Sequence, residues 1–188
     1  MHLAHMLIFL AVAVPASPMP SSALDSHLQT SRSSTARSQP AHTPTFKDFD
    51  RKPATISDEE FESLRGRVMS RCRVAAGTDP AKAPWYFYYE LGMELEKRGD
   101  PQRALGALIE ATNHRAEPKR SARMYGMWFS NYTPYFEIAK LHFDLGNWQC
   151  AADAINISTG TREVLEGDKE FFDFQALKAA IDKQVKSN

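Results

Sequence analysis

The sequence predicts an all-α fold of stacked helical hairpins, with about six helices in total. The main observation is a self-similarity, because the segment from Tyr88 to Thr112 recurs from Tyr135 to Thr159, at an offset of 47 residues. Each copy has the pattern of two short amphipathic helices separated by a glycine, Gly99 or Gly146. Within the copies, apolar residues recur at spacings of three and four, the period of a helix with one buried face. We therefore expect one helical hairpin to be used twice.

A helix is expected before the repeats, from Ser57 to about residue 76. Ser57 stands three residues before Glu60, which is the spacing of a capping box, and acidic residues fill the first turn, where the helix dipole favours them. Gly77 ends the segment. One apolar stripe runs along it, consisting of Phe61, Leu64, Val68, Cys72 and Ala75. The arginine-rich opposite face is interpreted as a solvated surface.

The two copies supply four further helices. Pro84 precedes the first, over about 85–98, and Pro101 opens the second, which runs to about residue 113. In the later copy Pro134 opens a helix, and another follows over 148–159 after a turn at Gly146. A last helix is predicted for 169–186. It and the helix at 57–76 are interpreted as end caps of the stack.

The pattern resembles the tetratricopeptide repeat, whose signature combines aromatic and apolar positions in a first helix with small residues in a second. The first copy matches it at Trp85, Tyr88, Leu91, Gly92, Leu95, Ala104, Leu108 and Ala111, and the second at Tyr132, Tyr135, Ile138, Ala139, Ala151, Ile155 and Ser158. Three features depart from the family. The terminal Pro of the signature is displaced to Pro118 in the first repeat and is missing in the second. Leu95 and His142 stand where it has an aromatic residue, and about 13 residues are inserted between the repeats. The resemblance covers roughly 68 residues and implies a right-handed superhelix of hairpins.

The resemblance also implies a binding groove lined by the first helices, which holds a peptide from a partner. By register, its residues here are Tyr86, Tyr89, Met93, Glu96, Lys97, Phe136, Lys140 and Asp144. Tyr89 and Met93 occupy positions where chaperone-binding members carry Lys and Asn, so that specialised activity is not implied. An alternative for each aromatic residue is that it packs against a neighbouring helix.

The insert at 114–134 begins with basic residues and then becomes strongly aromatic. Trp128 and Phe129 lie in its apolar half, together with Met124, Tyr125, Met127 and Tyr132. Burying one such ring is worth on the order of 2 kcal/mol, so the segment is expected either to pack as extra core or to form a recognition surface.

The N-terminal region divides into two parts. Residues 1–23 hold a short apolar run followed by small residues, typical of a secretory signal peptide. Residues 24–56 are rich in Ser, Thr and Pro and are predicted to be a disordered linker to the helical domain at 57–188. Export to the periplasm or the exterior follows if the leader is a signal, and a cytoplasmic location if it is not. No membrane insertion is expected after signal removal.

Composition and motifs argue against several functions. The 23 basic and 23 acidic residues balance, which does not suggest a nucleic-acid partner. No catalytic signature, phosphate loop or metal-ligand spacing is present, so no catalytic residue, metal or cofactor is predicted. Cys72 and Cys150 fall on apolar stripes and are expected to be buried and unpaired, because stacking places them beyond disulfide reach.

The resulting hypothesis is a non-catalytic adaptor or scaffold that binds a protein or peptide. Its contacts would be the first-helix groove and the 124–132 loop, including Trp128 and Phe129. An alternative is an accessory assembly factor of an envelope enzyme or secretion complex, which binds by its convex face.

Overall fold

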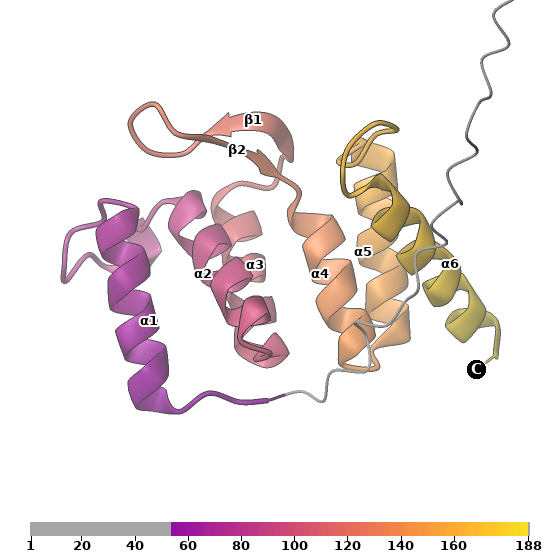
Figure 1. The fold of residues 1–188 in the computed structure, drawn as a ribbon, viewed down its shortest axis with the longest axis horizontal. Coiled ribbons are helices and arrows are strands. Elements are labelled where there is room, and N and C mark those ends of the chain that lie inside the picture. Colours follow the sequence, from indigo (N-terminus) through magenta and orange to yellow (C-terminus); the bar gives the residue numbers. More distant parts are fainter. Residues whose placement is uncertain (1–53, 188) are drawn as a thin grey trace, which may run out of the picture. The chain divides into compact units, whose positions relative to one another are not determined.

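The computed structural model of the chain describes residues 54–187. The predicted leader (1–23) and most of the predicted linker lie outside this range. Helices dominate the described part, as predicted from the sequence, but two short strands are also present (Figure 1). In chain order the elements are α1 (Asp58–Arg71), the 3-10 turn η1 (Pro80–Lys82), α2 (Trp85–Lys97), α3 (Pro101–His114), β1 (Lys119–Arg123), β2 (Phe129–Tyr132), α4 (Pro134–Asp144), α5 (Trp148–Thr161) and α6 (Phe171–Ser187).

Local sequence signals set the helix boundaries. The Ser57 hydroxyl accepts a hydrogen bond from the backbone N–H of Glu60 at 3.1 Å, which confirms the predicted start of α1. The predicted end of α1, at about residue 76, is wrong. The helix ends at Arg71, and Arg73 follows with a φ of 56°, a left-handed conformation that breaks the helical hydrogen-bond ladder.

The repeated segments form two helical hairpins. α2 packs against α3, and α4 packs against α5. In the first hairpin the helices approach closely at Gly92, where an added Cβ would lie 2.7 Å from Leu108 Cδ2 and 3.2 Å from the Ala104 carbonyl oxygen. Glycine is therefore required by space at this position, which explains why the first copy carries it.

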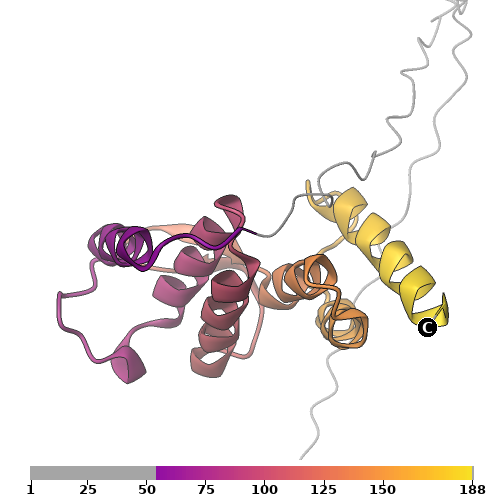
Figure 2. The ribbon, with the colours of Figure 1, turned by 90° about the horizontal axis from the view of Figure 1, so that it is seen from below.

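The hairpins join through α3 and α4, and the flanking helices cover the two ends. α1 packs against α2, and α6 packs against α5 and, more weakly, against α4 (Figures 1 and 2). Phe136 on α4 and Phe174 on α6 meet with their ring centroids 5.7 Å apart. The cysteine prediction is half wrong. Cys72 is buried, whereas Cys150 is exposed, and both are free thiols.

The insert is a β-hairpin, which the all-α prediction did not include. β1 and β2 pair antiparallel, with Ala122 opposite Ser130 and an irregular register toward Lys119. Within the hairpin segment, the side chains of Ala122, Met124 and Tyr132 are buried, whereas the residues around its turn are exposed. One part of the segment is therefore additional core, and the other part is exposed; its role as a recognition surface stays a prediction.

Tyr132 fixes the hairpin to α2 and α3. Its ring lies 4.4 Å from the Trp85 ring and 5.0 Å from the Tyr89 ring, centroid to centroid. Its hydroxyl donates to the Arg115 carbonyl oxygen at 2.7 Å, and the Arg115 guanidinium lies over the Trp85 ring. The aromatic half of the insert thus completes the core at one end of the first hairpin.

The described chain is ordered slightly before the predicted start at residue 57. The Ala54 N–H donates to the Gly99 carbonyl oxygen at 2.8 Å, and the Ile56 N–H donates to Asp100 Oδ2 at 3.2 Å. Arg103 Nη1 donates to the Ile56 carbonyl oxygen at 2.8 Å. Residues 54–57 are therefore held on the turn between α2 and α3.

Candidate functional site

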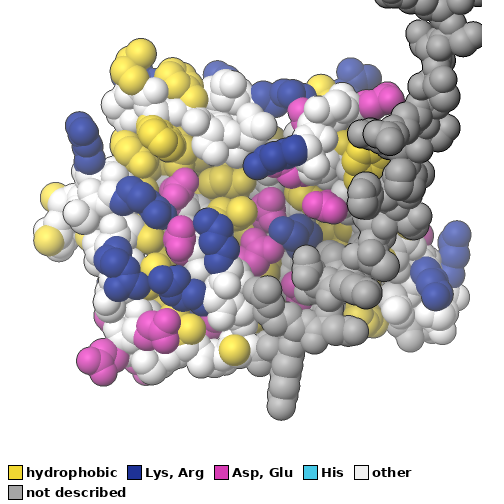
Figure 3. All heavy atoms as spheres, viewed as in Figure 1, with side chains coloured by type: hydrophobic (Ala, Val, Ile, Leu, Met, Phe, Trp, Pro, Cys, Tyr) yellow, Lys and Arg dark blue, Asp and Glu magenta, His cyan; other side chains and the backbone are white. Residues whose placement is uncertain are grey.

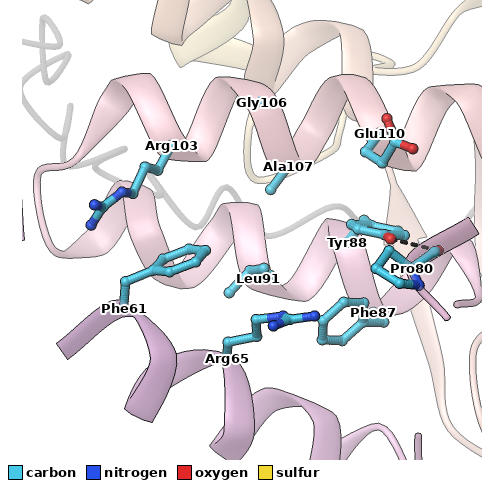
Figure 4. A pocket seen from close by; sticks show the side chains of 10 residues that line it. All are labelled: Phe61, Arg65, Pro80, Phe87, Tyr88, Leu91, Arg103, Gly106, Ala107 and Glu110. Carbon is cyan, nitrogen blue, oxygen red and sulfur yellow. Dashed lines mark hydrogen bonds between the residues drawn. The ribbon is translucent and has the colours of Figure 1, made fainter. Parts of the chain in front are cut away.

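A cleft of about 300 Å³ lies between α1 and α3, with α2 as its floor. Its lining is mainly apolar, with charged side chains at its margins (Figure 4). The lining residues are Phe61, Arg65, Pro80, Phe87, Tyr88, Leu91, Arg103, Gly106, Ala107 and Glu110. An apolar hollow with a few polar groups at its margin suits an apolar side chain of a peptide ligand.

One end of the cleft is built by η1. Asp79 caps this turn by accepting from the Ala81 N–H at 3.0 Å. The Tyr88 hydroxyl then donates to the Pro80 carbonyl oxygen at 2.7 Å, which holds the turn against α2 (Figure 4). The Tyr88 ring also stacks on His114 at 5.2 Å. Burial raises the pKa of Tyr88, so its hydroxyl stays protonated and continues to donate.

The other end is built around Arg103, which is already engaged within the chain. Its guanidinium bonds to Ile56 and Asp58 and lies over the Phe61 ring at 4.8 Å. Arg65 is less constrained, because its partner in the structure is the exposed Glu62 at 3.2 Å on the same helix. An ion pair of this kind at the surface contributes about 0–1 kcal/mol, so Arg65 is the cation that a ligand carboxylate can recruit most readily.

Gly106 leaves space on the α3 side of the cleft. A Cβ added at Gly106 would meet no atom within 4 Å, in contrast to the crowded Gly92. Glycine inside a helix costs roughly 0.5–1 kcal/mol relative to alanine, and packing in the described structure does not require it here. Gly66 of α1 and Gly160 of α5 are equally open and do not line the cleft, so a helical glycine in the sequence does not by itself indicate one. The cleft residues were missed by sequence reasoning.

The predicted first-helix groove is largely filled by the chain itself. Tyr89 is 5% exposed and Phe136 is 2% exposed. The Tyr89 hydroxyl lies 3.3 Å from both the Asn131 carbonyl oxygen and Thr133 Oγ1, next to β2. Phe136 is covered by Phe174 from α6. The prediction that Tyr89 and Phe136 contact a partner is therefore wrong for the described fold, because the insert and the last helix cover them.

Lys140, another predicted groove residue, is committed to an internal ion cluster. Its Nζ lies 2.8 Å from Glu96 Oε1 and 2.7 Å from Glu137 Oε2, which joins α2 to α4. Burial raises the pKa of Glu137 to about 7, although Lys140 acts in the opposite direction. Burial alone would lower the pKa of Lys140, but the two carboxylates outweigh it and raise that pKa. The cluster links α2 to α4 and occupies the Lys140 ammonium within the chain, so Lys140 is not presented to a ligand.

The remaining predicted contacts are accessible to different degrees. Tyr86 and Met93 are half-buried, and Lys97 and Asp144 are exposed. Lys97 pairs with Glu94 at 3.4 Å on its own helix. Basic and acidic side chains interleave over the face of α1 and α2, where Arg71 contacts Glu90 at 2.8 Å (Figure 3). The structure therefore brings these residues together only at the margins of the predicted groove.

Trp128 and Phe129 stand apart from the helical groove, at the end of the β-hairpin. They are 59% and 50% exposed, beside Met127 at 82%. Hydrophobic side chains gather in Figure 3 where Figure 1 places the loop of this hairpin. Their exposure keeps these two predicted contact residues available for binding.

Neither a protein-family model nor a curated protein sequence matches this chain. Within residues 54–187, no group of three or more His, Cys, Asp and Glu side chains is placed to hold a metal ion. Among the helices of that same range, none has the length and apolar character needed to cross a bilayer. The candidate sites accordingly rest on the geometry above.

Proposed function

We propose that this chain is a non-catalytic interaction module of the tetratricopeptide-repeat type, which binds a protein or peptide in the cleft between α1 and α3. The observation that carries the proposal is the unfilled apolar space at Gly106, between two helices whose charged residues line its rim. The resemblance to the repeat family supports it, since stacked hairpins of that family serve chiefly as scaffolds for recognition.

The position of the cleft shifts the proposed site away from the first-helix groove. In a repeat of this type α3 is a second helix, and α1, which precedes α2, takes the place of the second helix of an earlier repeat. The cleft would then belong to the convex face, the surface expected for an accessory assembly factor. Export of such a factor depends on the leader, which lies outside the described residues.

A binding role fits the cleft better than catalysis does. Arg103 and Glu110 stand at opposite ends of it (Figure 4). Arg103 is held by Asp58 and the Ile56 carbonyl oxygen. Acid–base chemistry needs groups that converge on one reacting atom, and the charged groups lining this cleft do not converge.

The test is to fill the cleft without disturbing the fold. Gly106→Met places a side chain in open space and replaces a poor helix former, so the variant should be as stable as the wild type or more stable by about 0.5–1 kcal/mol. Gly66→Met is the matched control, because Gly66 is an exposed glycine of α1 that also has no atom within 4 Å of an added Cβ and does not line the cleft.

A random peptide-display library provides the ligand. We expect the wild type and Gly66→Met to enrich the same peptides, with an apolar side chain next to a carboxylate that pairs with Arg65. Gly106→Met should lose at least about tenfold in affinity for those peptides, a change of about 1.4 kcal/mol. Equal binding by both variants, with both folded, would show that the cleft is not the site.

A further inference from the structure

The end of the β-hairpin carries an apolar surface that the helical cleft does not explain. Met127, Trp128 and Phe129 are consecutive and are 82%, 59% and 50% exposed. From Ser121 to Met124 the residues alternate between exposed and buried, but Gly126 to Phe129 are all exposed. Met127 lies in the turn, and Phe129 is the first residue of β2. The turn and the start of β2 therefore expose three consecutive apolar side chains.

The loop that carries these side chains is tightly built. The Met124 N–H donates to the Trp128 carbonyl oxygen at 2.9 Å, and the Trp128 N–H donates to the Tyr125 carbonyl oxygen at 3.0 Å. The Tyr125 ring lies parallel to the Trp128 ring, with 6.4 Å between the ring centroids. On its other contact, the Tyr125 ring centroid lies 5.8 Å from that of Tyr86 on α2. The exposed side chains are therefore presented on a fixed support, and no described element covers them.

Positive charge accompanies the apolar end. Residues 114–134 contain four Arg and Lys side chains and one acidic side chain. Arg120 is neutralised by Asp168 at 2.5 Å, and Arg115 lies over the Trp85 ring. Lys119 and Arg123 are exposed, and the Arg123 Nε donates to the Gly126 carbonyl oxygen at 2.8 Å, which places its guanidinium beside the apolar end.

We propose that this hairpin end, Met127 to Phe129, inserts peripherally into the surface of an anionic lipid bilayer. Aromatic side chains favour the boundary between headgroups and acyl chains, and a nearby cation adds attraction to anionic headgroups. Stable peripheral binding needs two such signals together, and the hairpin supplies both. Consecutive exposed apolar side chains beside an exposed cation match the two parts of an anionic bilayer surface, its acyl boundary and its charged headgroups.

The contact of the hairpin end with the bilayer surface does not involve the peptide cleft. It also does not require any segment to cross the membrane. It needs no apolar helix, because only the few side chains at the end of the hairpin enter the interface. If the module binds its partner in the cleft, the hairpin would hold the complex at a membrane surface.

The experiment uses the full chain with vesicles of phosphatidylcholine alone or mixed with one quarter phosphatidylglycerol, some containing brominated acyl chains. Bromine quenches only tryptophans that enter the acyl region, and the chain has three, Trp85, Trp128 and Trp148. We expect quenching with the anionic vesicles and a several-fold smaller effect with the neutral ones. Trp128→Ser should remove the quenching. The matched control is Phe172→Ser, because Phe172 is an aromatic residue of α6 that is 69% exposed, and this variant should keep the quenching.

The charge contribution is tested by Lys119→Gln combined with Arg123→Gln. This variant should bind anionic vesicles at least about threefold more weakly and lose most of the salt dependence, since screening acts on exposed charges. Absence of quenching in the wild type, equal quenching in Trp128→Ser, or equal loss in Phe172→Ser would overturn the proposal. A peptide or protein that needs Trp128 for binding, without any vesicle effect, would instead identify the hairpin end as a protein contact and would equally overturn it.

Discussion

Asp100 joins three parts of the domain, and its removal tests whether the described contacts hold the fold together. The side chain is fully buried. Its Oδ1 accepts from the Arg103 N–H at 3.1 Å and so caps α3, and its Oδ2 accepts from the Ile56 N–H at 3.2 Å. Asp100→Ala therefore removes a helix cap and leaves the partly buried amide of Ile56 without its acceptor.

The cost of Asp100→Ala follows from these two losses. A lost cap costs about 1 kcal/mol, and an unsatisfied partly buried donor about 1–3 kcal/mol, so we expect a total of about 2–4 kcal/mol. Asp100→Asn keeps one acceptor oxygen and should cost about half as much. Asp79→Ala is the control. Asp79 also caps a turn, but it is exposed, so its removal should cost less than about 1 kcal/mol.

Urea denaturation followed by circular dichroism measures these changes, provided that the m value stays constant across the variants. A decrease in the free energy of unfolding of less than about 0.5 kcal/mol for Asp100→Ala would refute the reasoning, because a partly buried amide without an acceptor should cost more than that. An equal loss in Asp79→Ala would show that capping alone, and not burial, sets the cost.

Three further predictions concern the hairpins. Gly92→Ala should destabilise the domain by about 1–3 kcal/mol, measured by urea denaturation, because the new Cβ would lie 2.7 Å from Leu108 atoms; a stabilisation would refute the close approach. Phe136→Ala should cost about 3–5 kcal/mol as a core truncation, and a near-neutral result would restore Phe136 as an open groove residue. For Glu137, burial raises the pKa from 4.5 to about 7, so its contribution to stability is full below the lower value and is lost as the pH rises through the higher one. The melting temperature should consequently fall between about pH 5 and 8, and Glu137→Gln should flatten that fall; an unchanged slope would contradict the assignment.

Much of the fold could be predicted because its signals are local. The cap at Ser57, the glycines at the hairpin turns and the prolines at the helix starts each act within one turn of helix. The self-similarity of the two copies also identified the paired helices, because equivalent small residues permit equivalent close approach. The end of α1 was placed wrongly, where Arg73 adopts a left-handed conformation that no local signal required, and the β-hairpin of the insert was not predicted.

The candidate sites were harder to predict, because whether a side chain is accessible depends on which distant segment of the chain packs over it. Tyr89 and Phe136 are large aromatic residues, a type that suits the floor of a binding groove and a protein core equally well. Tyr132 lies 43 residues after Tyr89 in the chain, and Phe174 lies 38 residues after Phe136. The packing of these distant rings made both residues core. The cleft between α1 and α3 was not predicted for the converse reason, since a space between helices that no side chain fills has no signal in the sequence.

The sequence by itself determined the helices, their pairing into hairpins and the aromatic insert between them. Hydrogen-bond capping and apolar periodicity operate over a few residues, so they are written directly into the order of amino acids. The tertiary structure alone decided that Met127 to Phe129 are exposed while Tyr132 is buried, and that the space beside Gly106 is left open. The hydrophobic effect has no direction and rewards any apolar coverage. Whether an apolar side chain becomes core or contact surface therefore depends on which distant segment packs over it.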